Sequence, residues 1–559
     1  MPDSGFFDPP GSVWDFAWWR FALEHGLNPF VTHFVDYPSG VNLADQASAP
    51  LLAILGIPIT TWFGPIATLN FFLMVAIAAS ASAMYFLVRF LSVRTFFATV
   101  AGLLYGFGPY MATESRDSAH LVLAFTPFPP LILLCLVAVA QKRLRATVAG
   151  VLIGALSAAQ ALVDPEVLTS LVLILVIGAV VAGIIYRPRR LRMRPFLVAF
   201  AIAAAEFIAL LAYPFWFALF GPDHIRGPVQ SPSALQPLAS DLLGPIVPTS
   251  QQFLSTTGLV HISDRFALGN PTESLAYVSL PVLILLAFFA IAFRRDRRVS
   301  GALVLALIAF VLSLGSHLAI AGHATSIPLP EGILAHIPLL DSTVPARFAL
   351  DVILFAAITF AVGLDDLINV KLASRAALAR ALTLPLSLCA CAVFLWPSAS
   401  TSGAPGSTGE IVAALDSLRP GSVVLTYPFP MWPYSTPMVW QALANMNIRL
   451  IGGYSYVQSP FGNGQPYAEL LSPPSVQEYL AQAQGGEDTD YPPSPSVFVV
   501  ESDLCRLIRN YRVSAILDAN LGTPNDAAVS TLFRTDLGTP IYQDSSFSYY
   551  VIGANSCTK

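Results

Sequence analysis

Long apolar runs recur between residues 66 and 397 and are separated by short polar segments. A helix of about 20 apolar residues can cross the roughly 30 Å hydrocarbon core of a bilayer. By this criterion the pattern predicts ten membrane spans in a mainly α, polytopic helical bundle. They are expected at about 66–92, 95–113, 121–141, 146–163, 166–186, 196–219, 274–293, 300–316, 347–368 and 377–397.

The lysines and arginines near these spans concentrate in alternate loops, at 89–94, 142–145, 187–194, 294–298 and 371–380. The opposite loops contain few basic residues, although they are longer in total. Short loops rich in Lys and Arg stay in the cytoplasm. An even number of spans then places both the N-terminal stretch and the C-terminal region outside the cytoplasm. We therefore expect a multi-pass protein of the cytoplasmic (inner) membrane.

Residues 1–65 form the expected first outer loop. Residues 12–26 predict an interfacial helix whose tryptophans lie at headgroup level, and residues 47–63 predict a second helix that dips into the outer leaflet. Nothing in residues 1–45 could carry this loop across the membrane. We therefore expect an additional span before Met1, which would bring the total to eleven.

The pattern changes near residue 400. Residues 398–410 include the stretch TSGAPGSTG, which is typical of a flexible linker. Residues 411–559 alternate strand-like runs such as VSAILDA with helical stretches, which predicts an α/β domain on the outer side. Cys505 and Cys557 are its only cysteines; in an oxidising exterior they could pair, or they could remain two free thiols.

Composition supports the membrane assignment. Apolar residues make up 55% of the 559 residues and charged residues only 11%, with a mean hydropathy of +0.65, so polar surface is too scarce for a soluble globule of this size. The net charge of −5 indicates no nucleic-acid partner. The sequence shows no phosphate-binding glycine loop and no zinc-type cluster. The eight histidines fall on the predicted outer side or at its boundary. Either the outer side holds a reactive site, or histidine is simply rare in apolar spans.

Several motifs occur in one order along nearly the whole chain: DPPGSVWDFAWWRFALEHGLNPF, YPSGVNL, HLVLAFTPFPPL, SDLLGPIVP, PLLDSTVPARF, YPFP and LIGGY. Together they resemble the bacterial family of GT-C-type membrane glycosyltransferases and its uncharacterised relatives. The resemblance implies an enzyme that takes a sugar from a polyprenyl-phosphate donor. The sugar would pass to a glycan, lipid or protein acceptor on the outer face, in cell-envelope assembly.

In that family a carboxylate of the first outer loop serves as the catalytic base, which indicates Asp8 or Asp15 here. A well-placed carboxylate that deprotonates the acceptor hydroxyl is worth about 10²- to 10⁴-fold in rate. Asp8 precedes the turn Pro9-Pro10-Gly11, and Asp15 lies on the predicted interfacial helix. Both could instead be ordinary solvated acids.

The leaving phosphate requires Arg, Lys or His donors, or a divalent cation, whose involvement the sequence leaves open. Asp164 and Glu166 could bind substrate or cap a helix, and Arg347 could bind phosphate or extend to the interface. Loops 220–271 and 317–346 are long enough to cover a vestibule. The candidate substrate-binding residues of the outer side are Arg116, His120, Asp164, Glu166, His224, Arg226, Glu273 and Arg347.

Two other classes of function remain open. A non-catalytic assembly or scaffold protein could retain the same fold, because fold alone does not prove activity. A transporter would be expected to show internal repeats and several charges at the middle of the membrane. Here no repeat is visible, and Glu206 is the only deep charge.

Overall fold

The computed structural model describes residues 8–186, 193–230, 232–270, 272–337, 340–370, 374–398, 408–431, 434–458, 464–465, 471–485, 496–553 and 557. The chain divides into two compact units. Unit 1 comprises Met1–Asn70, Tyr213–Val229 and Ser402–Lys559, and unit 2 comprises Phe71–Ala212 and Gln230–Thr401. Most of the predicted linker 398–410 lies outside the described residues.

Each of the ten expected spans coincides with helix in the structure. Four helical segments are long and apolar enough to cross a membrane by length and composition, and six shorter apolar helices accompany them within the described residues. The four segments are Pro65–Phe90, Leu121–Ala140, Met193–Phe220 and Pro345–Asn369. The mainly α fold and the membrane character are therefore confirmed, whereas the number of spans stays a prediction.

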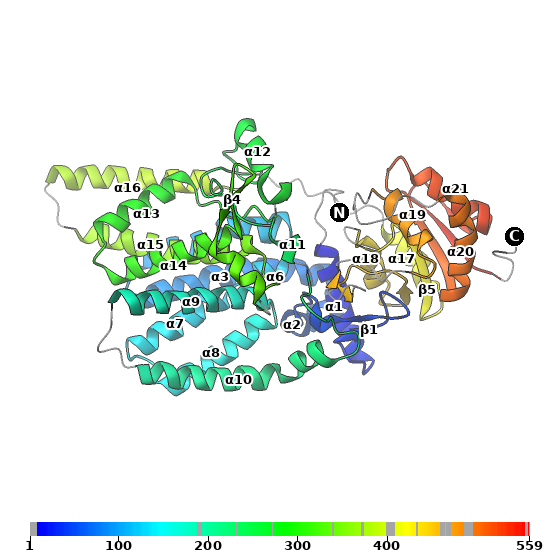
Figure 1. Ribbon diagram of the computed structural model, residues 1–559, viewed down its shortest axis with the longest axis horizontal. Coiled ribbons are helices and arrows are strands. Elements are labelled where there is room, and N and C mark those ends of the chain that lie inside the picture. The colour runs from blue at the N-terminus through cyan, green and yellow to red at the C-terminus, as the bar shows by residue number, and fades with distance from the viewer. Residues whose placement is uncertain are drawn as a thin grey trace. The chain divides into compact units, whose positions relative to one another are not determined.

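The helices that correspond to the expected spans follow one another along the chain (Figure 1). They are α3 (Pro65–Phe90), α4 (Thr95–Phe107), α6 (Leu121–Ala124) with α7 (Phe128–Ala140), α8 (Ala146–Ala161), α9 (Pro165–Tyr186), α10 (Met193–Phe220), α13 (Leu280–Ala292), α14 (Arg297–Ser313), α15 (Ala349–Asn369) and α16 (Ser374–Leu395).

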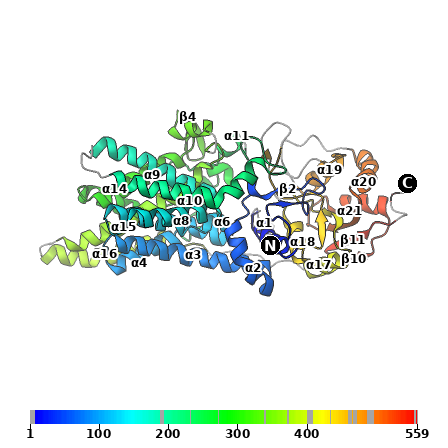
Figure 2. The same ribbon diagram turned by 90° about the horizontal axis from the view of Figure 1, so that it is seen from below.

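Helix α15 forms the centre of unit 2. Every residue from Ala349 to Asp365 is buried, and α4, α13 and α14 pack against the helix. At Gly363 a Cβ would lie only 2.4 Å from the ring of Phe289, so α13 can approach α15 closely only because this position has no side chain. Helices α14 and α15 run alongside each other in both views (Figures 1 and 2).

The segments between these helices contain short elements. They are α5 (Pro109–Ala112), the π-helical turn η2 (Thr113–Asp117), α11 (Pro232–Leu235), α12 (Thr257–Ser263), η3 (Phe266–Gly269), η4 (Pro330–His336) and η5 (Pro345–Phe348). Strands β3 (His317–Ile320) and β4 (His323–Pro328) pair as an antiparallel hairpin.

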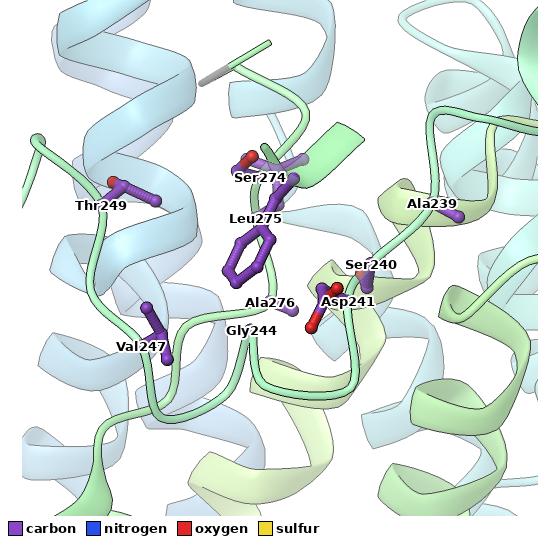
Figure 3. Close-up of a pocket in the computed structure, with 10 residues that line it drawn as sticks. Ala239, Ser240, Asp241, Gly244, Val247, Thr249, Ser274, Leu275 and Ala276 are labelled. Carbon is purple, nitrogen blue, oxygen red and sulfur yellow. The ribbon is translucent and has the colours of Figure 1, made fainter. Parts of the chain in front are cut away.

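The buried Asp241 carboxylate holds this hairpin in place. It accepts hydrogen bonds from Ala321 N at 3.0 Å and Gly322 N at 2.8 Å, in the turn between the two strands. The residues around Asp241 enclose a cavity of only about 10 Å³ (Figure 3). This volume accommodates about one water molecule. The contact therefore anchors the loops and provides no room for a substrate.

Unit 1 contains a five-stranded mixed sheet in the order β10-β11-β9-β5-β6. Strands β6 and β9 run parallel to β5, and β11 runs antiparallel to β9. The strands are β5 (Ser422–Tyr427), β6 (Ile448–Leu450), β9 (Val513–Ala519), β10 (Tyr542–Gln543) and β11 (Phe547–Val551). The helices of this region are α17 (Thr408–Asp416), α18 (Thr436–Leu443), α19 (Ser475–Ala483), α20 (Val497–Tyr511) and α21 (Asp526–Leu537).

The region that follows residue 407 is thus α/β in character. Its core includes Leu425, Ile516, Leu507 and Phe533 from two strands and two helices. A disulfide joins Cys505 to Cys557, with the Cα atoms 5.4 Å apart. The structure therefore contains the pair that the sequence left open, and the location of this domain outside the cytoplasm stays a prediction.

The first 70 residues also belong to unit 1. They contain α1 (Asp8–Glu24), the short strands β1 (Val31–Thr32) and β2 (Val41–Asn42), η1 (Leu43–Asp45) and α2 (Pro50–Phe63). The sequence predicts the tryptophans of α1 at headgroup level, yet Trp14, Trp18 and Trp19 are all buried inside the protein. The reason is that α1 packs against α2 and α18, which cover its aromatic side chains.

Candidate functional site

Several ionisable side chains from distant parts of the sequence meet in unit 2. Arg347 of η5 donates through Nη1 to Glu166 Oε2 and through Nη2 to Glu273 Oε1, the latter at 3.3 Å. Glu166 lies in the first turn of α9, and Glu273 precedes α13. We call Glu114, His120, Asp164, Glu166, Glu273 and Arg347 the acidic cluster.

Asp164 holds the start of α9 in place. Its Oδ1 accepts hydrogen bonds from Glu166 N at 2.7 Å and Val167 N at 3.1 Å, which is the geometry of a helix cap. Of the two roles that the sequence left open, substrate binding and helix capping, Asp164 has the cap, whereas Glu166 forms an ion pair with Arg347. The pKa of Asp164 is nevertheless raised by burial, although Arg347 and the two backbone donors oppose this effect.

Glu114 is completely buried in the π-helical turn η2. Its Oε2 lies 3.4 Å from His120 Nδ1 and 3.3 Å from the Ser118 hydroxyl. Its Oε1 has no hydrogen-bond partner within the described part of the chain. Burial raises the pKa of Glu114, and His120 partly counteracts the rise. Single π-helical turns occur frequently at functional sites.

The cluster is rich in acceptors that lack a donor. Glu114 Oε1 and Glu273 Oε2 are buried without a partner among the described residues. Both terminal nitrogens of Arg347 are already engaged by carboxylates. Arg347 Nε is a buried donor that also has no partner among the described residues. A ligand that brings hydroxyl groups would complement this arrangement, because a hydroxyl can both donate to a carboxylate oxygen and accept from Arg347 Nε. The described residues contain no group of three or more His, Cys, Asp or Glu that could hold a metal ion.

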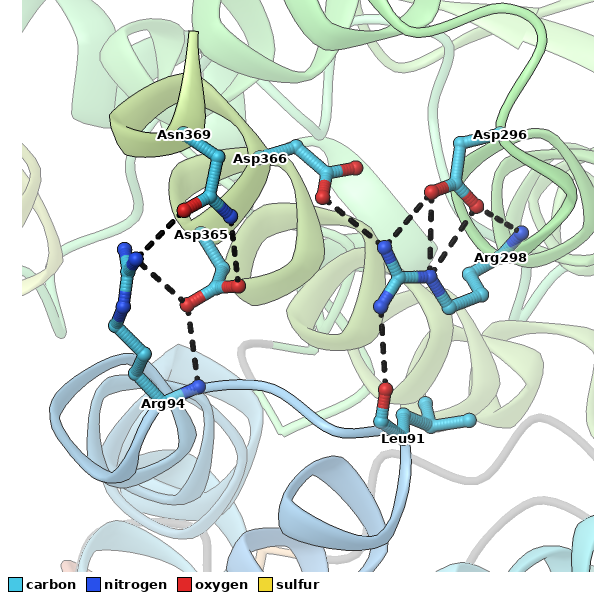
Figure 4. Close-up of polar contacts among 7 residues, drawn as sticks. All are labelled: Leu91, Arg94, Asp296, Arg298, Asp365, Asp366 and Asn369. Carbon is cyan, nitrogen blue, oxygen red and sulfur yellow. Dashed lines mark hydrogen bonds and ion pairs between the residues drawn. The ribbon is translucent and has the colours of Figure 1, made fainter.

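A second ionic group occupies the other end of α15 (Figure 4). Arg298 donates to Asp296, to Asp366 Oδ1 at 3.0 Å and to Leu91 O at 3.1 Å. Arg94 donates through Nη2 to Asn369 Oδ1 at 2.6 Å and through its backbone N to Asp365 Oδ1 at 3.1 Å. We call the seven residues Leu91, Arg94, Asp296, Arg298, Asp365, Asp366 and Asn369 the arginine network.

The spacing of the two groups matches a membrane. Arg347 directly precedes α15, and Asp365 lies near its end. The roughly 18 residues between them cover about 27 Å at a rise of about 1.5 Å per residue, close to the roughly 30 Å of the hydrocarbon core. The distance between the two groups along α15 is therefore close to the thickness of the hydrocarbon core.

The other predicted substrate-binding residues lie outside the acidic cluster. Arg116 pairs with Asp117 at 2.7 Å and donates to Ser398 O. His224 and Arg226 belong to unit 1, where His224 Nδ1 lies 2.9 Å from Gly221 O and Arg226 is exposed. The structure thus brings together His120, Asp164, Glu166, Glu273 and Arg347 of the eight candidates.

The two predicted bases share helix α1. Asp8 is its first residue, and its side chain lies outside the described part. Asp15 is largely covered by its neighbours, and burial raises the pKa of its carboxyl group well above the ordinary value. A raised carboxyl pKa approaches the range that suits a general base near neutral pH.

Sequence reasoning missed Glu114 as a site residue. It stands in the same short segment, ESRDSAH, as the predicted Arg116 and His120. A carboxylate immediately after an apolar helix can indicate a site residue. If such a carboxylate is buried, it requires a polar or charged partner. The π-helical turn that directs Glu114 inward has no comparable sequence signature.

Three solved structures are similar to this chain. The archaeal oligosaccharyltransferase AglB from Archaeoglobus fulgidus, in complex with an inhibitory peptide and a dolichol-phosphate, is 15% identical with a TM-score of 0.45, over 99% of this chain and 71% of that chain. ArnT from Cupriavidus metallidurans bound to undecaprenyl phosphate is 14% identical with a TM-score of 0.48, over 97% of this chain and 94% of that chain. The arabinofuranosyltransferase AftD from Mycobacteria is 15% identical with a TM-score of 0.46, over 99% of this chain and 40% of that chain.

No curated protein matches the chain. A family described as "Domain of unknown function (DUF6311)" matches residues 15–384, which include α1 from Asp15 onward and the entire acidic cluster. The chain therefore belongs to the DUF6311 family.

Proposed function

We propose that this protein is a membrane glycosyltransferase that moves a sugar from a polyprenyl-phosphate donor to an acceptor hydroxyl on the outer face of the cytoplasmic membrane. The acidic cluster is the observation that carries the proposal. Ionisable side chains buried among apolar helices are expensive and mark functional sites by default. Here six of them meet at one end of the helices, and two carboxylate oxygens are without a partner among the described residues.

The chemistry requires a base and a site for sugar hydroxyls. As the acceptor oxygen bonds to the anomeric carbon, the bond from that carbon to the phosphate oxygen breaks. The acceptor proton passes to a carboxylate, for which α1 offers Asp8 or Asp15, and polyprenyl phosphate leaves. The unpaired acceptors Glu114 Oε1 and Glu273 Oε2 suit the hydroxyl groups of a sugar ring.

Transfer in membranes tests the proposal. Vesicles that contain the full chain would receive radiolabelled polyprenyl-phosphate hexoses and pentoses, and label in larger products would be measured. We expect Asp8→Asn or Asp15→Asn to lower transfer by about 10²- to 10⁴-fold. Glu24→Gln on the same helix is the matched control, because Glu24 is exposed and pairs only loosely with Arg20 at 3.9 Å.

Two results would count against the proposal. Undiminished transfer in both aspartate variants would remove α1 as the source of the base. The absence of transfer from every donor by the wild-type chain, in vesicles where the protein is folded, would favour a non-catalytic assembly role.

A further inference from the structure

Strand β6 lies at the edge of the five-stranded sheet, and the first outer loop covers it. Leu450 N donates to Phe34 O at 2.8 Å, and Tyr37 N donates to Leu450 O at 3.1 Å. Asp36 N donates to Gly452 O at 3.2 Å. An edge strand presents unpaired backbone groups that proteins usually cover. In this protein the covering segment begins ten residues after the end of α1, the helix that carries the proposed bases.

Gln441 of α18 joins three elements with one buried amide. Its Oε1 accepts a hydrogen bond from Trp14 Nε1 of α1 at 2.6 Å. Its Nε2 donates to Phe34 O at 2.7 Å and to Ile448 O of β6 at 2.8 Å. The side chain is fully buried, so water cannot replace these hydrogen bonds in the folded protein.

Aromatic contacts support the same junction. The guanidinium of Arg449 lies 5.6 Å from the ring centre of Phe34 and 5.3 Å from that of Tyr37. Trp14 stacks on Trp18 at 5.8 Å, and Trp18 contacts Phe34 at 5.4 Å. The cation–π and aromatic contacts therefore hold the segment and α1 against the sheet together with Gln441.

The geometry points to Gln441 as a positioning residue for α1. Successive helical residues are rotated by about 100°, so a fixed Trp14 also sets the direction of the adjacent Asp15. Positions 8 and 15 are one heptad apart and fall within about 20° of each other around the helix. Together with the aromatic contacts, the hydrogen bond from Trp14 thus fixes the rotation of the helix that carries both candidate bases. The inference rests on the proposed function, because it assigns the domain after residue 407 the role of orienting those bases.

Hydrogen exchange and kinetics of the full chain in nanodiscs test the inference. We expect Gln441→Met, which keeps the shape and removes the hydrogen bonds, to speed amide exchange in α1 at least tenfold while β9 keeps its protection. The kcat of transfer falls at least tenfold, with the donor KM within twofold of the wild-type value. Gln441→Glu retains an acceptor for Trp14 and restores part of the kcat.

Gln484→Met is the matched control. Gln484 is equally buried, and its amide accepts from Phe429 N at 2.7 Å and donates to Phe429 O at 3.2 Å, away from α1. This variant should leave both α1 exchange and kcat unchanged. The inference would be overturned if Gln441→Met lowered the protection of α1 and β9 equally. It would also be overturned if amide exchange in α1 were the same in the Gln441→Met and Gln484→Met variants. A wild-type chain without transfer would defeat the proposed function, and the exchange comparison would still decide the role of Gln441.

Discussion

The acidic cluster and the arginine network are built from the same kinds of residue at opposite ends of α15, yet they differ in how completely they are paired. The carboxylates of the arginine network all have partners, and Arg94 remains 51% exposed. In the acidic cluster Glu114 is fully buried, and one oxygen each of Glu114 and Glu273 lacks a partner within the described residues. Completed pairing indicates a structural clamp, whereas buried unpaired acceptors indicate a place for a ligand.

The pKa values of one carboxyl group from each set, Asp296 and Glu114, are shifted in opposite directions. Burial opposes ionisation of Asp296, but the hydrogen bonds from Arg298 prevail and keep the pKa of Asp296 below its ordinary value. At Glu114 burial prevails over His120, and the pKa is raised. Arg298 therefore favours the charged form of Asp296, whereas burial disfavours the charged form of Glu114.

The largest expected effect is that of Arg347→Met. Removal of the guanidinium leaves Glu166 and Glu273 without their cation in a largely buried setting, which costs about 3 kcal/mol or more. Thermal unfolding in detergent would measure the loss. Arg298→Met is the matched change in the arginine network, and we expect about 1 kcal/mol there because its partners can reach water. Equal losses in the two variants would contradict the distinction between the groups.

Glu114→Gln separates function from stability. The amide keeps the shape of the side chain and removes the burial penalty of a carboxylate, so unfolding should occur at the same or a higher temperature. Transfer should fall by about 10²-fold, since a specific acceptor is lost. Asp296→Asn should lower the unfolding temperature and leave the rate of transfer unchanged. An active Glu114→Gln enzyme would exclude Glu114 from the site.

Asp296 and Glu114 should respond to pH in opposite directions. The lowered pKa of Asp296 contributes stability that is present above its unfolded value and is lost as the pH falls below about 4. The raised pKa of Glu114 makes the folded state retain a proton, so stability declines as the pH rises above about 4.5. Unfolding temperatures between pH 3 and 7 would show each slope vanish in the corresponding amide variant. Screening limits the Asp296 contribution to less than about 1 kcal/mol.

The smallest expected effect is that of Arg94→Gln. This side chain is half exposed, and its contact with Asp365 is long, at 3.8 Å. Its loss should lower the free energy of unfolding by less than about 1 kcal/mol and leave transfer intact. A loss as large as that of Arg347→Met would show that the arginine network is more than a half-solvated clamp.

Much of the architecture follows from local sequence. Each apolar run of sufficient length overlaps a helix, because hydropathy along one segment suffices to identify it. The helix of the expected span 274–293 begins only at Leu280, and the expected span 121–141 consists of the two helices α6 and α7. The predicted strand run VSAILDA is strand β9 in the structure. The first outer loop and the domain after residue 407 share one compact unit, which no local pattern indicates.

The grouping of the site residues required three-dimensional packing. The sequence suggested eight substrate-binding residues, but Glu166, Glu273 and Arg347 meet only because the starts of α9 and α15 and the segment before α13 lie together. Trp14 is buried rather than interfacial because α18, more than 400 positions later, covers it. The hydropathy pattern is a local property of each segment, and it predicts which stretches are helical. The meeting of helix ends depends on side-chain contacts between segments far apart in the chain, and these contacts have no periodic signature.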